Sequence, residues 1–387
     1  MMPAASRSLQ LNSLRAFYFC NFGAIGALFP FLPLLLAARG LDGVEIAWVM
    51  VLTPLCNLLV PPLWGAVADT WHVRLWLLRA TAVGGAAAVL LLLPAHDLWH
   101  IALAIGLMSF FRAPTTSLVD ATVYHASGGG HAAFSQVRVW GSIGFGIFAL
   151  LLGWLQRELL PMLLIGVTGA LFLASAAATA PLAAAARQRE PRVVALALQI
   201  LRRPAVLLFL AGTALYYFGH STYDVYFGLH AQKLGLSNAF IGSAWALGVG
   251  VEVAVMLLAP RFIERVSSRR LLVACAAVAA TRWGLLAWTA VPWAVLAIQS
   301  LHGVTYGLWY LSLVKHVQDI AGERLRSTLQ SVATAALGLG QVGGYLVGGQ
   351  IFEHLGGAAL YRGAALAALG ALLCYAASAL STGAQRK

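Results

Sequence analysis

The chain has 387 residues, of which 60% are hydrophobic and only 10% charged, with a formal net charge of +12. Soluble domains carry about 25% charged residues, so this composition excludes a soluble protein and predicts an integral membrane protein. Apolar stretches of about 20 residues, the length that crosses a bilayer as a helix, recur along the whole chain.

Twelve membrane-spanning helices are predicted from hydropathy windows of about 19 residues. They are expected at 11–38, 45–68, 75–94, 98–124, 135–156, 160–182, 204–232, 239–263, 270–291, 293–314, 327–352 and 358–381. The first run is too long for the apolar region of a cleaved signal peptide, so we interpret it as the first span. The polar connector 183–203 predicts an N-terminal six-helix half over 1–182 and a C-terminal six-helix half over 204–387.

The basic residues predict an orientation in which both termini and the connector lie in the cytoplasm. Two of the 25 Lys and Arg residues then fall in mid-membrane, Arg112 and Arg282. Only four fall outside: Arg39, Arg157, Lys233 and Arg362. All the others lie on the cytoplasmic side, as the positive-inside rule requires. The charge of +12 is therefore a topology signal, and no nucleic-acid partner is needed to explain it.

A short motif occurs at the end of the predicted span 45–68 and again at the end of the predicted span 239–263. A glycine or proline, an acid and an arginine stand at equal offsets in both copies: Gly65, Asp69 and Arg74, then Pro260, Glu264 and Arg269. We interpret each copy as a cytoplasmic clasp, with a gating role for Gly65, Asp69 and Arg74; the alternative is two unrelated basic loops. Glycines at a four-residue spacing in 327–352, and others in 135–156, favour close helix packing.

Twelve spans in two halves with this loop motif resemble the major facilitator superfamily. The resemblance covers essentially the full chain, and the motif indicates the fold and not the substrate. It implies two six-helix halves with inverted repeats, a solute site near the midplane and a monomer. The expected fold class is therefore an all-α membrane protein with the major facilitator fold.

Three ionisable residues lie in or near the membrane in the first half: Arg112, Asp120 and Arg138. Each charge at the bilayer centre costs roughly 2.5–3.5 kcal/mol unless it is paired or hydrated. Arg112 and Asp120 are eight residues apart, so one continuous helix would place them on one face, toward a central cavity. Asp120 is expected to pair with Arg138. The alternatives are a structural ion pair and, for Arg138, an anchor at the membrane interface.

The second half carries its own intramembrane set: Asp224, Glu252, Arg282 and His302. Glu252 lies in mid-helix, where a buried carboxylate resists ionisation, and His302 titrates near neutral pH. An acid, an imidazole and a guanidinium at similar depth favour a proton relay, and Asp224 is expected to belong to the same proton-coupling set. The alternative is a static polar network that joins the helices. Aromatic residues that could line a solute site include Tyr18, Trp140 and Tyr306.

Two further stretches, Gln136–Phe145 and Gln299–Gly307, together with Arg112-Ala-Pro114 and Asp120, resemble the phenylpropionate-permease-like branch of the superfamily. That branch is related to the lactose-permease type and to nucleoside:proton symporters. The resemblance implies that Asp120 and Arg138 contact solute, and that Glu252, Arg282 and His302 couple protons. One departure is that no acid follows His302 by one turn, which makes Glu252 the leading proton carrier.

These observations predict a secondary transporter that moves a small organic solute with a proton across a bacterial inner membrane. The solute is expected to be an aromatic carboxylate, or a sugar or nucleoside. The alternatives are a drug/proton antiporter and a non-transporting membrane sensor. The sequence has no HExxH, GxSxG or P-loop motif, so neither an enzyme nor a cofactor is expected. The four cysteines lack metal-ligand spacing, so no metal site is expected.

Overall fold

The computed structural model describes residues 4–71, 73–126, 131–156, 160–182 and 203–383. Helices and turns account for these ranges. The chain divides into two compact units: Met1–Gln188 with Ala231–Val249, and Arg189–His230 with Gly250–Lys387. Most of the expected connector, 183–202, lies outside the described residues, so the predicted boundaries of the two halves stay a prediction.

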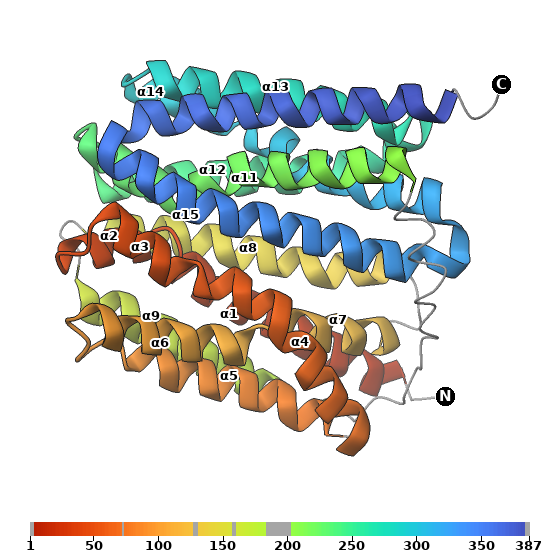
Figure 1. The fold of residues 1–387 in the computed structure, drawn as a ribbon. Helices are drawn as coiled ribbons and strands as arrows, with labels where there is room; N and C mark the ends of the chain where they lie inside the picture. Colours follow the sequence, from red (N-terminus) through yellow and green to blue (C-terminus); the bar gives the residue numbers. More distant parts are fainter. Residues whose placement is uncertain (1–3, 72, 127–130, 157–159, 183–202, 384–387) are drawn as a thin grey trace. The chain divides into compact units, whose positions relative to one another are not determined.

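The first unit is built from the helices α1 to α9, drawn in red to yellow in Figure 1. They are α1 (Ala4–Leu28), α2 (Leu32–Ala38), α3 (Gly43–Met50), α4 (Leu52–Trp71), α5 (Arg74–Leu90), α6 (Leu98–Arg112), α7 (Thr115–Ala126), α8 (His131–Leu155) and α9 (Pro161–Ala178). Helix α1 packs mainly against α8 and α9, and α5 packs against α6 and α9.

The second unit contains the remaining helices. They are α11 (Pro204–Lys233), α12 (Asn238–Leu258), η1 (Ala259–Arg261), η2 (Ile263–Arg265), α13 (Ser268–Trp288), α14 (Pro292–Gln299), η3 (Gly303–Leu308) and α15 (Trp309–Gly383). The end of α11 and the larger, N-terminal part of α12, within Ala231–Val249, group with the first unit instead. There Trp245 packs edge-on against Phe29, with ring centroids 6.0 Å apart, and Trp154 donates to Ser243 at 3.2 Å.

Several spans that the sequence predicts as single helices are interrupted at proline. The expected helix 11–38 is divided into α1 and α2 around Pro30, and the expected helix 98–124 is divided into α6 and α7 around Pro114. Proline has no backbone N–H, and its ring clashes with the preceding turn, so it ends or bends a helix. At its other end, α6 begins after Asp97, which caps the helix by accepting from the backbone N–H groups of Trp99 and His100.

The label α15 covers more than one pass of the chain. Gly356 has a φ of 81°, in the left-handed region that glycine adopts readily. The chain folds back on itself at this point. The segments before and after Gly356 pack together, with Gly348 against Leu360 and Gly363 against Ile351. Figure 1 shows this blue ribbon reversing direction. The two helices predicted at 327–352 and 358–381 are therefore both present.

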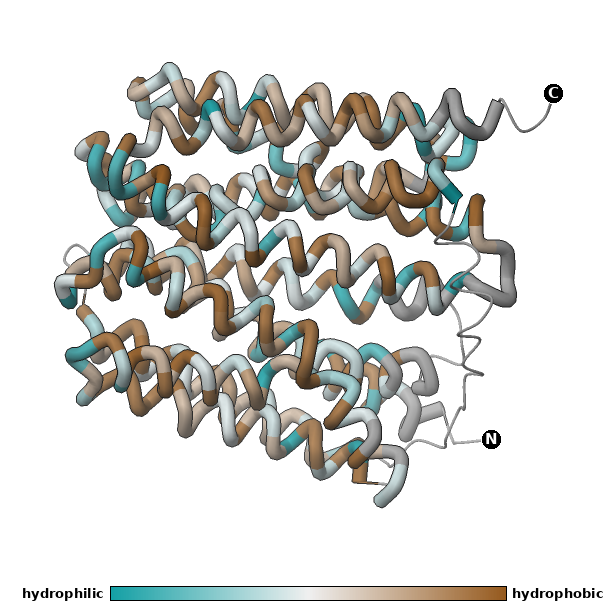
Figure 2. The backbone as a smooth tube through the Cα atoms, viewed as in Figure 1, coloured by the Kyte–Doolittle hydropathy of each residue, from teal (hydrophilic) through white to brown (hydrophobic). Residues whose placement is uncertain are grey.

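Nine segments within the described residues are long and apolar enough to cross a membrane. One of them, Thr328–Ser378, contains two predicted spans. The predicted span 75–94 corresponds to α5, which has 17 residues, and 293–314 is divided among α14, η3 and the start of α15. Figure 2 shows hydrophobic residues recurring along the helices and hydrophilic residues gathering at their end turns. The chain is a multi-pass membrane protein.

Glycines allow close helix contacts in both units, as their spacing predicts. A Cβ added at Gly144 of α8 would lie 2.2 Å from the Phe19 carbonyl oxygen of α1. A Cβ added at Gly340 of α15 would lie 2.2 Å from the Ala214 carbonyl oxygen of α11. Both distances are far below van der Waals contact, so only glycine permits these helix pairs to approach this closely.

Candidate functional site

Arg282 is the centre of a polar cluster inside the second unit. It lies on α13, and its side chain is completely buried. Its Nη1 donates to Thr305 Oγ1 at 2.7 Å, and its Nη2 donates to Gln299 Oε1 at 2.7 Å. The rings of Tyr223 and Trp283 lie 4.6 and 4.5 Å from its guanidinium carbon. Charge-assisted hydrogen bonds and cation–π contacts together offset the cost of burying this charge.

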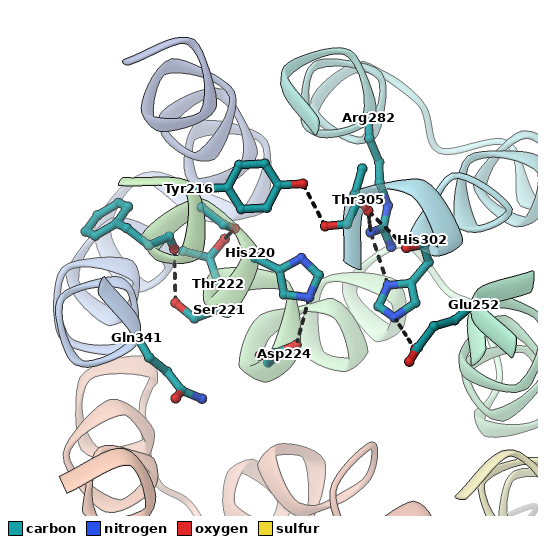
Figure 3. Close-up of polar contacts among 12 residues, drawn as sticks. Tyr216, His220, Ser221, Thr222, Asp224, Glu252, Arg282, His302, Thr305 and Gln341 are labelled. Carbon is teal, nitrogen blue, oxygen red and sulfur yellow. Dashed lines mark hydrogen bonds and ion pairs between the residues drawn. The ribbon is translucent and has the colours of Figure 1, made fainter. Parts of the chain in front are cut away.

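His302 connects Arg282 to Glu252 (Figure 3). Its Nδ1 lies 3.2 Å from Arg282 Nη1, and its Nε2 lies 3.5 Å from Glu252 Oε2. Because a guanidinium can only donate, His302 Nδ1 must accept, and the neutral ring then carries its proton on Nε2. Arg282 thereby fixes the tautomer that turns an N–H toward the Glu252 carboxylate. The expected acid, imidazole and guanidinium are in contact.

The backbone beside Glu252 is a single stretch of π-helix, η3. A Cβ added at Gly303 would lie 2.8 Å from the Val251 carbonyl oxygen, and one added at Gly307 would lie 3.1 Å from Glu252 Cγ. These glycines let η3 lie directly on α12. The Tyr216 hydroxyl donates to the Thr305 carbonyl oxygen at 2.6 Å within the same stretch. Short π-helical segments occur frequently at functional sites.

Asp224 belongs to the same unit but has a different partner. His220 Nε2 lies 3.9 Å from Asp224 Oδ1, and both residues are on α11 (Figure 3). The His220 ring lies 5.5 Å from the His302 ring and stacks on Tyr306 at 5.3 Å, centroid to centroid. His220 was not predicted as a site residue, although it lies one turn before Asp224 on α11. Gln299 was named only as the first residue of the stretch Gln299–Gly307, without a role as a partner of Arg282.

The first unit brings Asp120 near its predicted partner, Arg138, and into contact with Tyr18, which was predicted only as a possible solute-site aromatic. The Tyr18 hydroxyl of α1 donates a short hydrogen bond to Asp120 Oδ1 of α7. Asp120 also lies within electrostatic range of Arg138 of α8. Tyr18 is completely buried and stacks on Phe22, with ring centroids 5.7 Å apart, whereas Arg138 is exposed. Asp120 therefore accepts from a fixed donor beside a positive charge.

Arg112 does not share the surroundings of Asp120, contrary to expectation. It is the last residue of α6, and its guanidinium lies 5.7 Å from the Phe172 ring of α9. A Cβ added at Gly85 of α5 would lie 3.5 Å from Arg112 Cγ. The break at Pro114 separates α6 from α7, so the eight-residue spacing no longer fixes a common face for Arg112 and Asp120. A role of Arg112 in solute binding stays a prediction.

Comparison with known proteins supports one family over nearly the whole chain. The model of the family described as "MFS_1 like family" matches residues 11–363. The chain belongs to this family of transporters of the major facilitator superfamily. The maltose permease of Geobacillus stearothermophilus is 32% identical over 350 residues, which cover 87% of this chain and 86% of the permease. The Probable 3-phenylpropionic acid transporter of Escherichia coli K12 is 28% identical, covering 88% and 90%.

Solved structures agree on the fold. The crystal structure of the nucleoside transporter NupG superposes on this transporter with a TM-score of 0.83 at 17% identity, covering 95% of this chain and 98% of that one. The major facilitator fold expected from the sequence is thus confirmed. The resemblance to the phenylpropionate, sugar and nucleoside carriers is confirmed as well.

The remaining predicted positions of this transporter are the first copy of the repeated motif and two aromatic residues. Gly65 and Asp69 lie near the end of α4 and Arg74 begins α5, as the motif predicts, but the Asp69 side chain lies outside the described residues. Trp140 packs edge-on against Phe19 and stays 39% exposed. Tyr306 lies in η3 and stacks on His302, with ring centroids 5.6 Å apart.

Proposed function

We propose that this transporter carries a small organic solute inward together with a proton, by alternating access, across the cytoplasmic membrane of a bacterium. The termini and the connector would lie in the cytoplasm, as the basic residues predict. The observation that carries the proposal is the Glu252 carboxylate. It is 7% exposed and faces a histidine whose tautomer is fixed by a buried guanidinium.

Glu252 is the proton carrier in this proposal, and His302 positions it. A second proton on His302 would have to occupy Nδ1, which already accepts from Arg282. Glu252 can take a proton without breaking that contact. Protonation removes a buried negative charge, and it weakens the attraction toward His302 and Arg282. Coupling arises if solute binding and protonation of Glu252 stabilise the same conformation of the carrier.

For the solute, we favour a hydroxyl-bearing molecule such as a sugar. Asp120 already offsets the charge of Arg138, and Tyr18 shows that the Asp120 carboxylate accepts from a hydroxyl group. An acid beside a guanidinium can accept and donate hydrogen bonds to neighbouring hydroxyls. The relationship to a maltose permease supports this choice.

An aromatic carboxylate is the second candidate. Arg112 has a buried Nε without a hydrogen-bond partner among the described residues, and its guanidinium lies over an aromatic ring. A carboxylate on a small aromatic acid could balance that charge. The relationship to the 3-phenylpropionic acid transporter supports this candidate.

The test is the internal pH of proteoliposomes that contain the purified protein, measured as solutes are added outside. Glycosides come first, then phenylpropionate-like acids, then nucleosides. We expect acidification with one class, lost in Glu252→Gln while exchange of labelled solute across the membrane continues. Glu353→Gln is the matched control, because Glu353 is an exposed acid outside both the polar cluster and the repeated motif.

Other outcomes would overturn the proposal. Alkalinisation on addition of a cationic drug would indicate an antiporter. Solute binding without any flux would indicate a sensor. Acidification that persists in Glu252→Gln would remove Glu252 as the proton carrier and leave the symport itself intact.

A further inference from the structure

Asp224 is a buried acid that the mechanism above does not use. Its side chain is 11% exposed. The His220 Nε2 atom at 3.9 Å is its nearest ionic partner, and this distance exceeds that of a hydrogen bond. Within the described part of the chain, no donor forms a hydrogen bond with the Asp224 carboxyl group.

Arg282 does not take the place of that donor: none of its hydrogen bonds reaches Asp224, and its Nε has no hydrogen-bond partner among the described residues. Nη1 is shared between Thr305 and His302, and Nη2 donates to Gln299. Arg282 therefore acts on Asp224 only through space. The guanidinium can balance one carboxylate, and its contacts are on the side of His302 and Glu252.

The other titratable groups around Asp224 supply no positive charge. Besides Arg282, they are His220, Tyr217 and Tyr223 of α11, and Tyr345 and Tyr361 of α15. The tyrosines are neutral, and His220 is buried among aromatic rings with no partner at Nδ1 among the described residues. An ionised Asp224 carboxylate would therefore lack a hydrogen-bond donor and would have to share the Arg282 charge with Glu252, which is strongly unfavourable.

We propose that Asp224 is a second proton-binding site, and that its proton stays with the carrier throughout transport. Arg282 then balances Glu252 alone, and the cluster is neutral with Asp224 in its acid form. Where the proposed symport holds, this assigns the transported proton to Glu252 and gives Asp224 a role different from the coupling role expected from the sequence. The carrier would move a single proton per solute although two acids are buried side by side in one cluster.

The direct test is infrared spectroscopy of the purified full-length protein at neutral pH. The carbonyl stretching band of a protonated carboxyl group is expected in the wild type and is expected to disappear in Asp224→Asn. Asp120→Asn is the matched control, because Asp120 has the hydrogen-bond donor, Tyr18, and the nearby exposed cation, Arg138, that Asp224 lacks. A band that is unchanged in Asp224→Asn, or lost in Asp120→Asn, would overturn the proposal.

A second measurement separates this proposal from the proposed function. The ratio of protons to solute in proteoliposomes is expected to be the same in Asp224→Asn as in the wild type, whatever the rate of transport. A lower ratio would make Asp224 an exchangeable site and overturn the resident-proton assignment. If Glu252→Gln still moved protons, Glu252 would no longer be the proton carrier of the proposed function, whereas loss of the infrared band in Asp224→Asn would still establish the proton on Asp224. Melting temperatures of each variant identify any that do not fold.

Discussion

The two units treat a buried acid in opposite ways. In the first, Asp120 has a fixed hydroxyl donor, Tyr18, and lies in the field of Arg138. In the second, Glu252 faces an imidazole at 3.5 Å, and Asp224 faces another at 3.9 Å. Both of these distances are longer than a hydrogen bond between charged groups. Asp120 therefore has a hydrogen-bond donor and a nearby cation, whereas Glu252 and Asp224 each face an imidazole beyond that distance.

The difference indicates which acid can bind and release protons. A carboxylate that is held ionised by a donor and a cation is suited to bind a solute hydroxyl, because its charge is constant. A carboxylate whose nearest partner is a neutral histidine gains and loses a proton at a much smaller cost in free energy. One chain can therefore use the same residue type for solute recognition in one unit and for proton binding in the other.

The largest loss of stability is expected when the Arg282 cation of the second unit is removed. Arg282→Met takes away three hydrogen-bonded contacts and leaves Glu252 without its counter-charge. We expect a loss of about 3–5 kcal/mol in the free energy of unfolding, as for a buried pair that loses one partner. Denaturant titration in detergent, followed by fluorescence of the buried tryptophans, measures it.

Arg138→Met is the control for that experiment, since Arg138 is exposed. An exposed ion pair contributes about 0–1 kcal/mol, so its removal should cost little stability. Equal losses in the two variants would mean that the two units do not differ in how deeply their charges are buried.

In the first unit, removing the Tyr18 hydroxyl donor should weaken solute binding. Tyr18→Phe deletes the hydroxyl that fixes Asp120 and leaves the ring that stacks on Phe22. A hydrogen bond to a charged group contributes about 1.5–3 kcal/mol, so we expect solute affinity to fall by about tenfold or more. Equilibrium binding of the solute identified in proteoliposomes measures this loss.

Tyr226→Phe is the matched control for Tyr18→Phe. Its hydroxyl donates to the Tyr345 carbonyl oxygen at 2.9 Å in the second unit, away from Asp120. The same chemical deletion there should leave the affinity for solute unchanged. Weaker binding in both variants would point to a general loss of structure and not to the Asp120 donor.

Much of the fold follows from the sequence because hydropathy and charge are collective signals. The run of apolar residues that forms α12 predicts a span however its side chains pack. Breaks within spans are more local: Pro30 and Pro114 divide expected helices, and only the structure shows where the second segment begins. The long α15 is the opposite case, because the reversal at Gly356 occurs without an interruption in its helical assignment.

The polar cluster could be predicted in part. Glu252, Arg282 and His302 are conspicuous because charge and imidazole are rare in apolar helices. Gln299 and Thr305 are ordinary polar residues, and only the direction of the Arg282 side chain makes them partners. Arg112 was misplaced for a similar reason: the spacing to Asp120 assumes a straight helix, and Pro114 divides it. Spacing on one helix was therefore less reliable than the identity of rare residues.

The smallest expected effect concerns the packing that holds Glu252 against η3. In Gly307→Ala the new Cβ would lie 3.1 Å from Glu252 Cγ, so the carboxylate side chain must shift by a few tenths of an ångström. Such overpacking costs about 1–3 kcal/mol when the neighbours cannot move. Because the Glu252 side chain can move, we expect a cost of about 1 kcal/mol. It would be measured as a several-fold fall in uphill accumulation of solute, with binding affinity intact. Gly250→Ala is the control, because a Cβ there meets nothing within 4 Å. Equal effects of the two alanines would mean that helix flexibility, and not the position of the carboxylate, limits coupling in the second unit.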